Sequence, residues 1–271
     1  RLSSEIGLEG AEVEISPIKE HRFLLILRGE QLDHRIDDTD PHRTGVEPID
    51  PQPKDGVGAN DGESLRKTID LVRSFSEQAR EILAGESPAN MVLLRGFSSL
   101  PDWPTLDKLF EMKCAALVDY PMYFGVATLV GMEAKRCDRA LVAKVEEAQQ
   151  RWDDCHFYFI HMKGTDSAGE DGDRDRKVER IEAVDQQLPD LLELRPDVLV
   201  VTGDHSTPSP LASHSWHPVP VLLHAKHART DGVDRFDERA CLVGGLGPRL
   251  PATSLLPLML AHAGRLDRFG A

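Results

Sequence analysis

Cysteine, positive charge and long apolar runs are scarce in this sequence, and each scarcity excludes a class of protein. The four cysteines include no Cys-x-x-Cys pair, and a chain of this length needs no disulfide framework, so we interpret them as reduced thiols of a cytoplasmic protein. Asp and Glu outnumber Lys and Arg by 46 to 32, and the net charge of −14 argues against a nucleic-acid partner. No apolar run approaches the roughly 18 residues of a transmembrane helix, so no membrane partner is expected.

The start of the chain also lacks two common features. Its first residue is Arg rather than Met, and no signal-peptide pattern follows. We therefore expect that the chain was processed or is a piece of a longer protein. Its 271 residues, 40% of them apolar, suffice for one large domain or two modest ones.

The order of the apolar segments predicts two modules that meet near residue 88. Before that point, residues 23–27 are typical of a strand, and residues 63–85 have an apolar face at helical spacing. Beyond it, strands alternate with helices, which predicts an α/β domain with a doubly wound, mostly parallel sheet. The strands expected there are residues 91–95, 115–118, 157–161, 197–202 and 219–223. The expected helices are residues 106–112, 121–132, 139–150, 174–195 and 252–263.

An adjacent Asp204 and His205 come shortly after the apolar run 198–201. This run is typical of a fully buried parallel strand. The carboxyl end of such a strand is where open α/β sheets bind their ligands. His214 follows within a turn bounded by prolines, so three candidate metal ligands lie close together in the sequence.

A second group of carboxylates, Asp166 and Glu170, follows another expected strand. On a turn entering a helix, this spacing puts both side chains on one side. Taken alone, the group is better explained as a solvated acidic loop that caps the next helix. Together with the Asp-His pair and His214, however, it has the residue types and positions of a site for two divalent metal ions.

Three late motifs resemble one known family. They are Gly164–Gly172 (GTDSAGEDG), Thr202–Pro208 (TGDHSTP) and His214–Val221 (HSWHPVPV). They are similar to motifs of the cofactor-independent (2,3-bisphosphoglycerate-independent) phosphoglycerate mutases, archaeal-type branch, within the alkaline phosphatase superfamily. Weaker similarity extends over nearly the whole chain, at residues 21–30, 38–42, 93–96, 110–113 and 234–238.

The resemblance implies a fold, a reaction and a set of site residues. Residues 1–88 would be the C-terminal part of an inserted substrate-binding domain, and residues 89–271 a metal-binding, phosphatase-like domain. The reaction would interconvert 3-phosphoglycerate and 2-phosphoglycerate through a phosphoserine. Asp166, Glu170 and His214 would hold one divalent cation, Mn²⁺ or Mg²⁺, and Asp204 and His205 the other.

The resemblance also implies residues that contact the substrate. Lys113 would lie near the phosphoryl group and lower the cost of charge there. Arg22, Arg28 and Arg35 are candidates for binding the small anionic substrate, because a planar guanidinium binds phosphate and carboxylate bidentately. The alternative for these arginines is surface charge that flanks a strand.

The sequence departs from the family at two points. The family has His where this chain has Glu170, which adds a negative charge and favours Mn²⁺ or Mg²⁺; His161 and His217 are alternative nitrogen ligands. The family also needs a serine nucleophile and an early Asp ligand, which precede the segment that residues 21–42 resemble. Residues 60–64 (NDGES) contain an Asp and a Ser that could be mistaken for these two residues, but their position just before a helix fits a helix cap better. We therefore expect a C-terminal portion that lacks mutase activity by itself.

Two other functions are compatible with the same motifs. One is a related metal-dependent phosphohydrolase or phosphonate-processing enzyme, because the superfamily shares the metal ligands. The other is a non-catalytic metal-binding or regulatory relative, in which Glu170 marks the decay of a ligand. The arginines of the first module favour the mutase.

Overall fold

The computed structural model describes residues 1–18, 21–57, 62–138 and 140–266, and it divides the chain into two compact units. Unit 1 is Arg1–Asp102 and unit 2 is Trp103–Ala271. The division falls after the boundary expected near residue 88, because residues 89–102 belong to unit 1. Among the described residues, every helix is too short or too polar to span a lipid bilayer.

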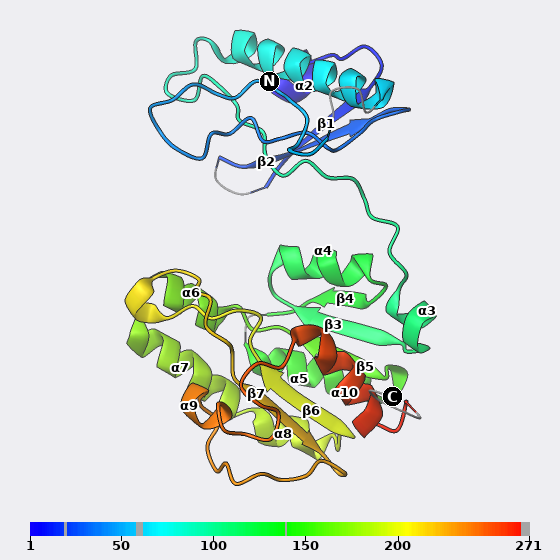
Figure 1. The fold of residues 1–271 in the computed structure, drawn as a ribbon, viewed down its shortest axis with the longest axis vertical. Coiled ribbons are helices and arrows are strands. Elements are labelled where there is room, and N and C mark those ends of the chain that lie inside the picture. The colour runs from blue at the N-terminus through cyan, green and yellow to red at the C-terminus, as the bar shows by residue number, and fades with distance from the viewer. Residues whose placement is uncertain (19–20, 58–61, 139, 267–271) are drawn as a thin grey trace. The chain divides into compact units, whose positions relative to one another are not determined.

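Unit 1 is a two-stranded sheet packed against one long helix (Figure 1). Its elements are α1 (Leu2–Glu5), β1 (Glu12–Pro17), β2 (Phe23–Arg28) and α2 (Glu63–Leu83), with β1 and β2 antiparallel. The expected apolar face of α2 is confirmed: Leu65, Val72 and Phe75 are buried in the core of this unit. Of the residues expected to cap α2, Asn60 and Asp61 lie outside the described residues.

The strand expected at residues 91–95 is wrong, because these residues carry no strand. Leu94 is instead a buried core residue of unit 1. The Thr39 backbone N–H donates to the Leu94 carbonyl at 2.8 Å, and the Leu94 N–H donates to the Thr39 hydroxyl at 2.8 Å. The segment is therefore held by hydrogen bonds to the polar loop rather than by a neighbouring strand.

Unit 2 contains the expected alternation of strands and helices, which confirms the α/β class. The strands are β3 (Cys114–Val118), β4 (Glu133–Arg136), β5 (Phe157–Ile160), β6 (Val198–Thr202) and β7 (Val221–Ala225). The helices are α3 (Leu106–Phe110), α4 (Pro121–Leu129), α5 (Leu141–Gln150), α6 (Gly164–Glu170), α7 (Arg174–Asp185), α8 (Leu188–Glu193), α9 (Glu238–Cys241) and α10 (Leu255–His262). The single helix expected at 174–195 is two helices, α7 and α8, and Pro189 lies in the first turn of α8, where proline is favoured.

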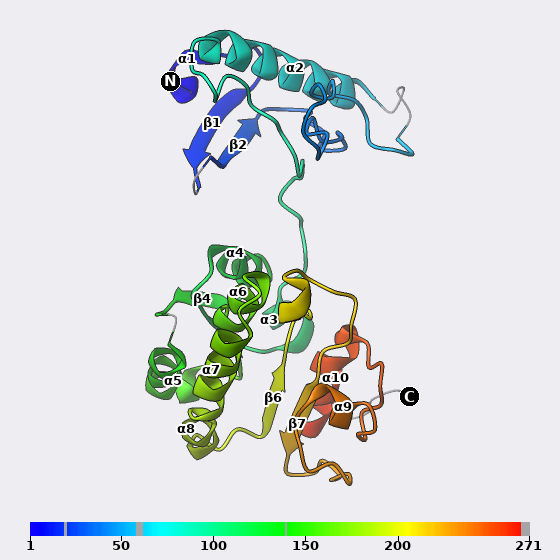
Figure 2. The same ribbon diagram turned by 90° about the vertical axis from the view of Figure 1, so that its left-hand side faces the viewer.

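The strands of unit 2 form two sheets. One is parallel, in the order β4-β3-β5, and all of β3 is buried between its neighbours and the helices. The other pairs β6 with β7 in antiparallel fashion. The prediction of a fully buried parallel strand at β6 is therefore wrong in direction, and its side chains are only partly buried. Figure 2 shows β6 and β7 side by side, with the α6 and α7 helices nearby.

Candidate metal centre

Two loops that leave the carboxyl ends of β5 and β6 meet in unit 2. The first leads into α6, which carries Asp166 and Glu170. The second follows β6 and carries Asp204 and His205. An isolated bridge pairs Ser206 with Ser215, whose N–H donates to the Ser206 carbonyl at 2.8 Å. This bridge holds the segment that carries His214 against the segment that carries His205.

The structure brings all five predicted metal ligands together. His214 Nε2 lies 3.4 Å from Asp166 Oδ1 and 3.4 Å from Glu170 Oε1. His205 Nδ1 lies 3.8 Å from Asp166 Oδ1, and its Nε2 lies 3.6 Å from Asp204 Oδ2. The two imidazole rings are 3.8 Å apart between centroids. The His205 ring therefore lies between Asp166, a ligand predicted for one cation, and Asp204, a ligand predicted for the other.

The donor set fits a divalent cation. Asp166, His205 and His214 each offer one ligand atom, and these atoms all lie within 4.8 Å of one another. Carboxylate oxygens with imidazole nitrogens suit Mn²⁺ and Zn²⁺, and added carboxylates favour Mn²⁺ and Mg²⁺. The side chain of Asp166 is mostly buried, and those of Glu170 and His214 are half exposed. A cation can thus approach Asp166 from the solvent side.

Lys163 is a charged neighbour that the sequence analysis did not assign. Its ammonium group forms an ion pair with Asp166 and lies 3.9 Å from Glu170 Oε2. Burial opposes ionisation of Asp166, but hydrogen bonds from Lys163 and Thr207 outweigh this cost, so the pKa of the Asp166 carboxyl lies below its ordinary value. The carboxylate is therefore ionised and ready to bind a cation at neutral pH.

Thr207 and Tyr123 are two more neighbours that the sequence analysis missed. The Thr207 hydroxyl lies 2.5 Å from Asp166 Oδ1 and 3.1 Å from His205 Nδ1. The Tyr123 hydroxyl, on α4, donates to Asp204 Oδ2. The sequence position of Thr207, two residues after His205, indicates that it lies near the site. The sequence gives no such indication for Tyr123, because only folding brings α4 to the loop after β6.

The alternative nitrogen ligands lie elsewhere. The His161 ring stacks on Tyr123 at 3.7 Å, and its Nδ1 faces Asp119 Oδ1 at 3.5 Å. His217 Nδ1 lies 2.9 Å from the Ser215 hydroxyl. Glu170, rather than either histidine, is the side chain next to His214.

The structure does not bring Lys113 to this cluster. Lys113 directly precedes β3, and its Nζ lies 3.4 Å from Glu133 Oε1. Because β3 and β5 are parallel and the cluster lies beyond the carboxyl end of β5, Lys113 lies at the opposite end of the sheet. A strand of this length separates the two ends by roughly 16 Å.

The three predicted substrate-binding arginines all lie in unit 1. Arg22 is exposed just ahead of β2. Arg28, at the end of β2, pairs with Glu14 on β1 at 2.5 Å. Arg35 pairs with Asp33 at 2.7 Å. Their role in substrate binding stays a prediction.

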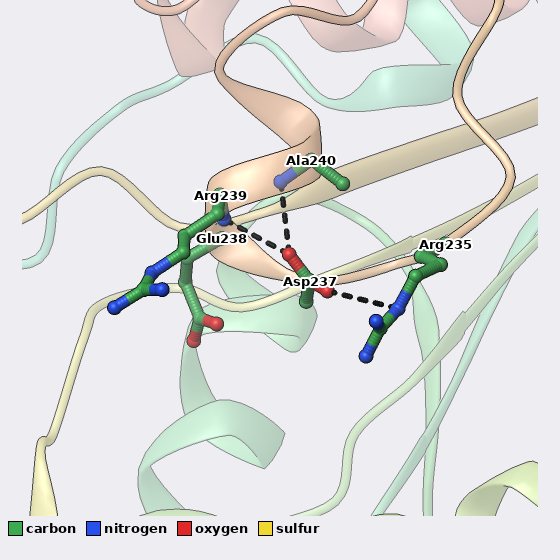
Figure 3. A pocket seen from close by; sticks show the side chains of 5 residues that line it. All are labelled: Arg235, Asp237, Glu238, Arg239 and Ala240. Atoms are coloured by element: carbon green, nitrogen blue, oxygen red, sulfur yellow. Dashed lines mark hydrogen bonds and ion pairs between the residues drawn. The ribbon is translucent and has the colours of Figure 1, made fainter.

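The DRFDE motif at residues 234–238 has a local structural role. The Asp237 carboxylate accepts the backbone N–H groups of Arg239 and Ala240 at 3.0 and 2.8 Å and so caps α9 (Figure 3). Hydrogen bonding to the Ala240 N–H holds the pKa of this carboxyl below its ordinary value. Arg235 Nε lies 3.5 Å from the same carboxylate. Within this motif, Asp237 is explained by capping of a helix start.

The fold and the cluster define a class, and comparisons with known proteins agree. The model of the metalloenzyme superfamily matches residues 75–262, so the chain belongs to that superfamily. The model of 2,3-bisphosphoglycerate-independent phosphoglycerate mutase matches residues 1–90. This match and the relatives described next confirm the predicted resemblance to the 2,3-bisphosphoglycerate-independent phosphoglycerate mutases.

Curated relatives match almost the entire chain. Probable 2,3-bisphosphoglycerate-independent phosphoglycerate mutases from Thermus thermophilus and Aquifex aeolicus are 44% and 42% identical to it, each over 97% of this chain. The chain spans 64% of the length of each of these relatives.

Solved structures support the fold. A protein from Pyrococcus horikoshii matches with a TM-score of 0.69 and 29% identity, over 82% of this chain and 62% of its own. The cofactor-independent phosphoglycerate mutase from Thermoplasma acidophilum matches with a TM-score of 0.66 and 24% identity, over 97% of this chain and 68% of its own.

Proposed function

We propose that the protein of which this chain forms part interconverts 3-phosphoglycerate and 2-phosphoglycerate, a step of glycolysis and gluconeogenesis in the cytoplasm. The observation that carries the proposal is the convergence of three carboxylates and two imidazoles at the loops after β5 and β6. Similarity to the curated relatives supports the same reaction, because they carry the name of this enzyme.

Two divalent cations, Mn²⁺ or Mg²⁺, are the cofactors of this proposal. Asp166, Glu170 and His214 hold one, and Asp204 and His205 hold the other. When bound, such cations stabilise the transferring phosphoryl group and lower the pKa of a serine nucleophile. The contacts of His214 with both carboxylates of α6 support the first group, and the 3.6 Å approach of His205 Nε2 to Asp204 supports the second.

The two parts of the chain have different tasks in this proposal. Residues 89–271 supply the cations, and residues 1–88, as part of an inserted domain, supply Arg22, Arg28 and Arg35 for the phosphate and carboxylate of the substrate. The exposed carboxylate of Glu14 pairs with Arg28, and the mostly buried carboxylate of Asp33 pairs with Arg35. The solvated pair of Arg28 with Glu14 is weak, so an anionic substrate can replace Glu14 there.

The serine nucleophile and an early Asp ligand belong, in this proposal, to the part of the relatives' length that this chain does not span. The serine oxygen attacks the phosphorus of the substrate, and the substrate oxygen leaves. The glycerate then turns and takes the phosphoryl group back on its other hydroxyl. Closure around the substrate excludes water, since attack by water would give a phosphatase.

Assay of the full-length parent protein tests the proposal. With Mn²⁺ and 3-phosphoglycerate, coupled to enolase, we expect rapid formation of 2-phosphoglycerate and only slow hydrolysis of p-nitrophenyl phosphate. Asp204→Asn should lower turnover at least about 100-fold, because one cation loses a charged ligand. Asp185→Asn, at an exposed position of α7, is the matched control and should retain activity. Efficient hydrolysis of the phosphomonoester without isomerisation would instead establish a phosphohydrolase.

A further inference from the structure

We propose that Thr207 is a positioning residue that fixes the tautomer of His205 and links the two groups of metal ligands. The inference rests on the metal role proposed above for His205. Thr207 is only 3% exposed, and its hydroxyl lies 2.5 Å from Asp166 Oδ1 and 3.1 Å from His205 Nδ1. A single hydroxyl thus touches a ligand of each proposed cation.

The number of protons determines the direction of both hydrogen bonds. An ionised carboxylate only accepts, so the one hydroxyl proton of Thr207 goes to Asp166. The Thr207 oxygen then offers a lone pair to His205 Nδ1, which must carry the proton. In the neutral imidazole, this leaves the lone pair on Nε2.

The free lone pair of His205 is on the side where a cation is proposed. Nε2 is the nitrogen that lies 3.6 Å from Asp204 Oδ2, the other proposed ligand of the same cation. Direct contact of Nδ1 with Asp166 is weaker, because these atoms are 3.8 Å apart, beyond hydrogen-bond range. Thr207, rather than Asp166, therefore sets the tautomer, as a hydrogen bond to the second ring nitrogen does in metal sites.

Thr207 is itself fixed from two helices. Its carbonyl accepts a hydrogen bond from Lys177 Nζ on α7 at 2.6 Å. On α6, a Cβ at Gly169 would lie 2.4 Å from the same carbonyl, so only glycine permits this approach. The hydroxyl therefore has little freedom to leave its two partners.

A buried threonine can also serve packing alone, and Thr68 provides the matched control. Thr68 is 7% exposed and lies on α2 in unit 1. Its hydroxyl donates to the Ser64 carbonyl at 2.8 Å and accepts the Asp33 N–H at 2.8 Å. Thr68→Val thus removes a buried hydroxyl with two hydrogen bonds without touching a metal ligand.

The experiment compares the wild-type full-length parent protein with its variants Thr207→Val, Thr207→Ser and Thr68→Val. Nitrogen-15 NMR of the His205 ring, in metal-free protein at pH about 8, reports the tautomer. Titration with Mn²⁺ reports the dissociation constant. Thr207→Val should lose the single Nδ1–H tautomer and bind Mn²⁺ about 10-fold more weakly or worse, as for other residues that orient metal-bound histidines. Thr207→Ser should stay within about threefold of the wild type, and Thr68→Val should lower the Tm alone.

Each alternative outcome has a distinct meaning. An Nε2–H tautomer in the wild-type parent protein would overturn the inference even if Thr207→Val failed to fold. Unchanged tautomer and affinity in Thr207→Val would overturn it too. A wild-type parent protein that has the Nδ1–H tautomer but binds no Mn²⁺ would support the positioning by Thr207 and contradict the metal role in the proposed function.

Discussion

Three ionisable side chains are buried together where β3 and β5 end. Asp119 Oδ1 lies 3.5 Å from both Lys144 Nζ and His161 Nδ1, and the side chains of Lys144 and Asp119 are 0% and 5% exposed. Burial lowers the pKa of the His161 imidazole, and Lys144 acts in the same direction, while Asp119 opposes them. The His161 imidazole is therefore neutral in the folded chain near neutral pH.

A pH-dependent loss of stability follows from His161. Because its pKa in the folded chain lies below the ordinary value of about 6.5, only the unfolded chain takes up this proton as the pH falls. The contribution of His161 is therefore complete above about pH 6.5 and declines below it, by at most about 1.4 kcal/mol per pH unit. Urea unfolding followed by tryptophan fluorescence reports unit 2, which holds Trp103, Trp152 and Trp216.

His161→Gln should flatten this pH dependence. The control is His224→Gln, at an exposed position of β7, which should reproduce the wild-type profile. Equal slopes below pH 6.5 for the wild type and His161→Gln would show that the imidazole does not take up a proton on unfolding.

Residues whose chemistry is explicit in a short motif could be predicted from the sequence. Asp204 and His205 were predicted as partners because they are adjacent after an apolar run. Lys163 directly precedes the first motif and Thr207 lies within the second, yet their contacts depend on how two loops meet. No local sequence pattern predicts how the loops after β5 and β6 pack against each other.

Element directions are less predictable than element positions. The apolar run of β6 marks a strand, but the pattern of a buried parallel strand is shared by an antiparallel strand that is covered on part of both faces. The structure pairs Val198 with Ala225 and Thr202 with Val221, so β7 returns along β6. By contrast, α2 was predictable because its apolar face repeats over many turns of the helix.

The helix α2 is the element on which unit 1 depends. Phe75 is completely buried in the core between α2 and the strands β1 and β2. Phe75→Ala should destabilise unit 1 by about 3–5 kcal/mol, because it removes an aromatic side chain and leaves a cavity. Hydrogen exchange of the α2 amides measures the loss. The control is Glu77→Ala, at an exposed position of the same helix, which should cost less than about 0.5 kcal/mol. An equally small effect of Phe75→Ala would contradict the role of Phe75 in the core.

At the scale of the whole molecule, the acidic net charge suits the proposed cofactors. The net charge of −14 disfavours anionic partners but raises the local concentration of divalent cations. The proposed substrate is an anion, so its binding to an acidic protein requires local positive charge, which the proposed cations supply. A chain with only part of this machinery should bind cations without turning over substrate.

This separation of binding from catalysis can be measured on the 271-residue chain. Five ligands converge in it, so Mn²⁺ titration should detect binding that weakens as salt screens the acidic cluster. The enolase-coupled assay with 3-phosphoglycerate should detect no turnover, because the proposed nucleophile is a serine outside these residues and no phosphoserine can form. The full-length parent, assayed in parallel, is the positive control. Turnover by the 271-residue chain would contradict the proposed nucleophile and require a nucleophile within residues 1–271.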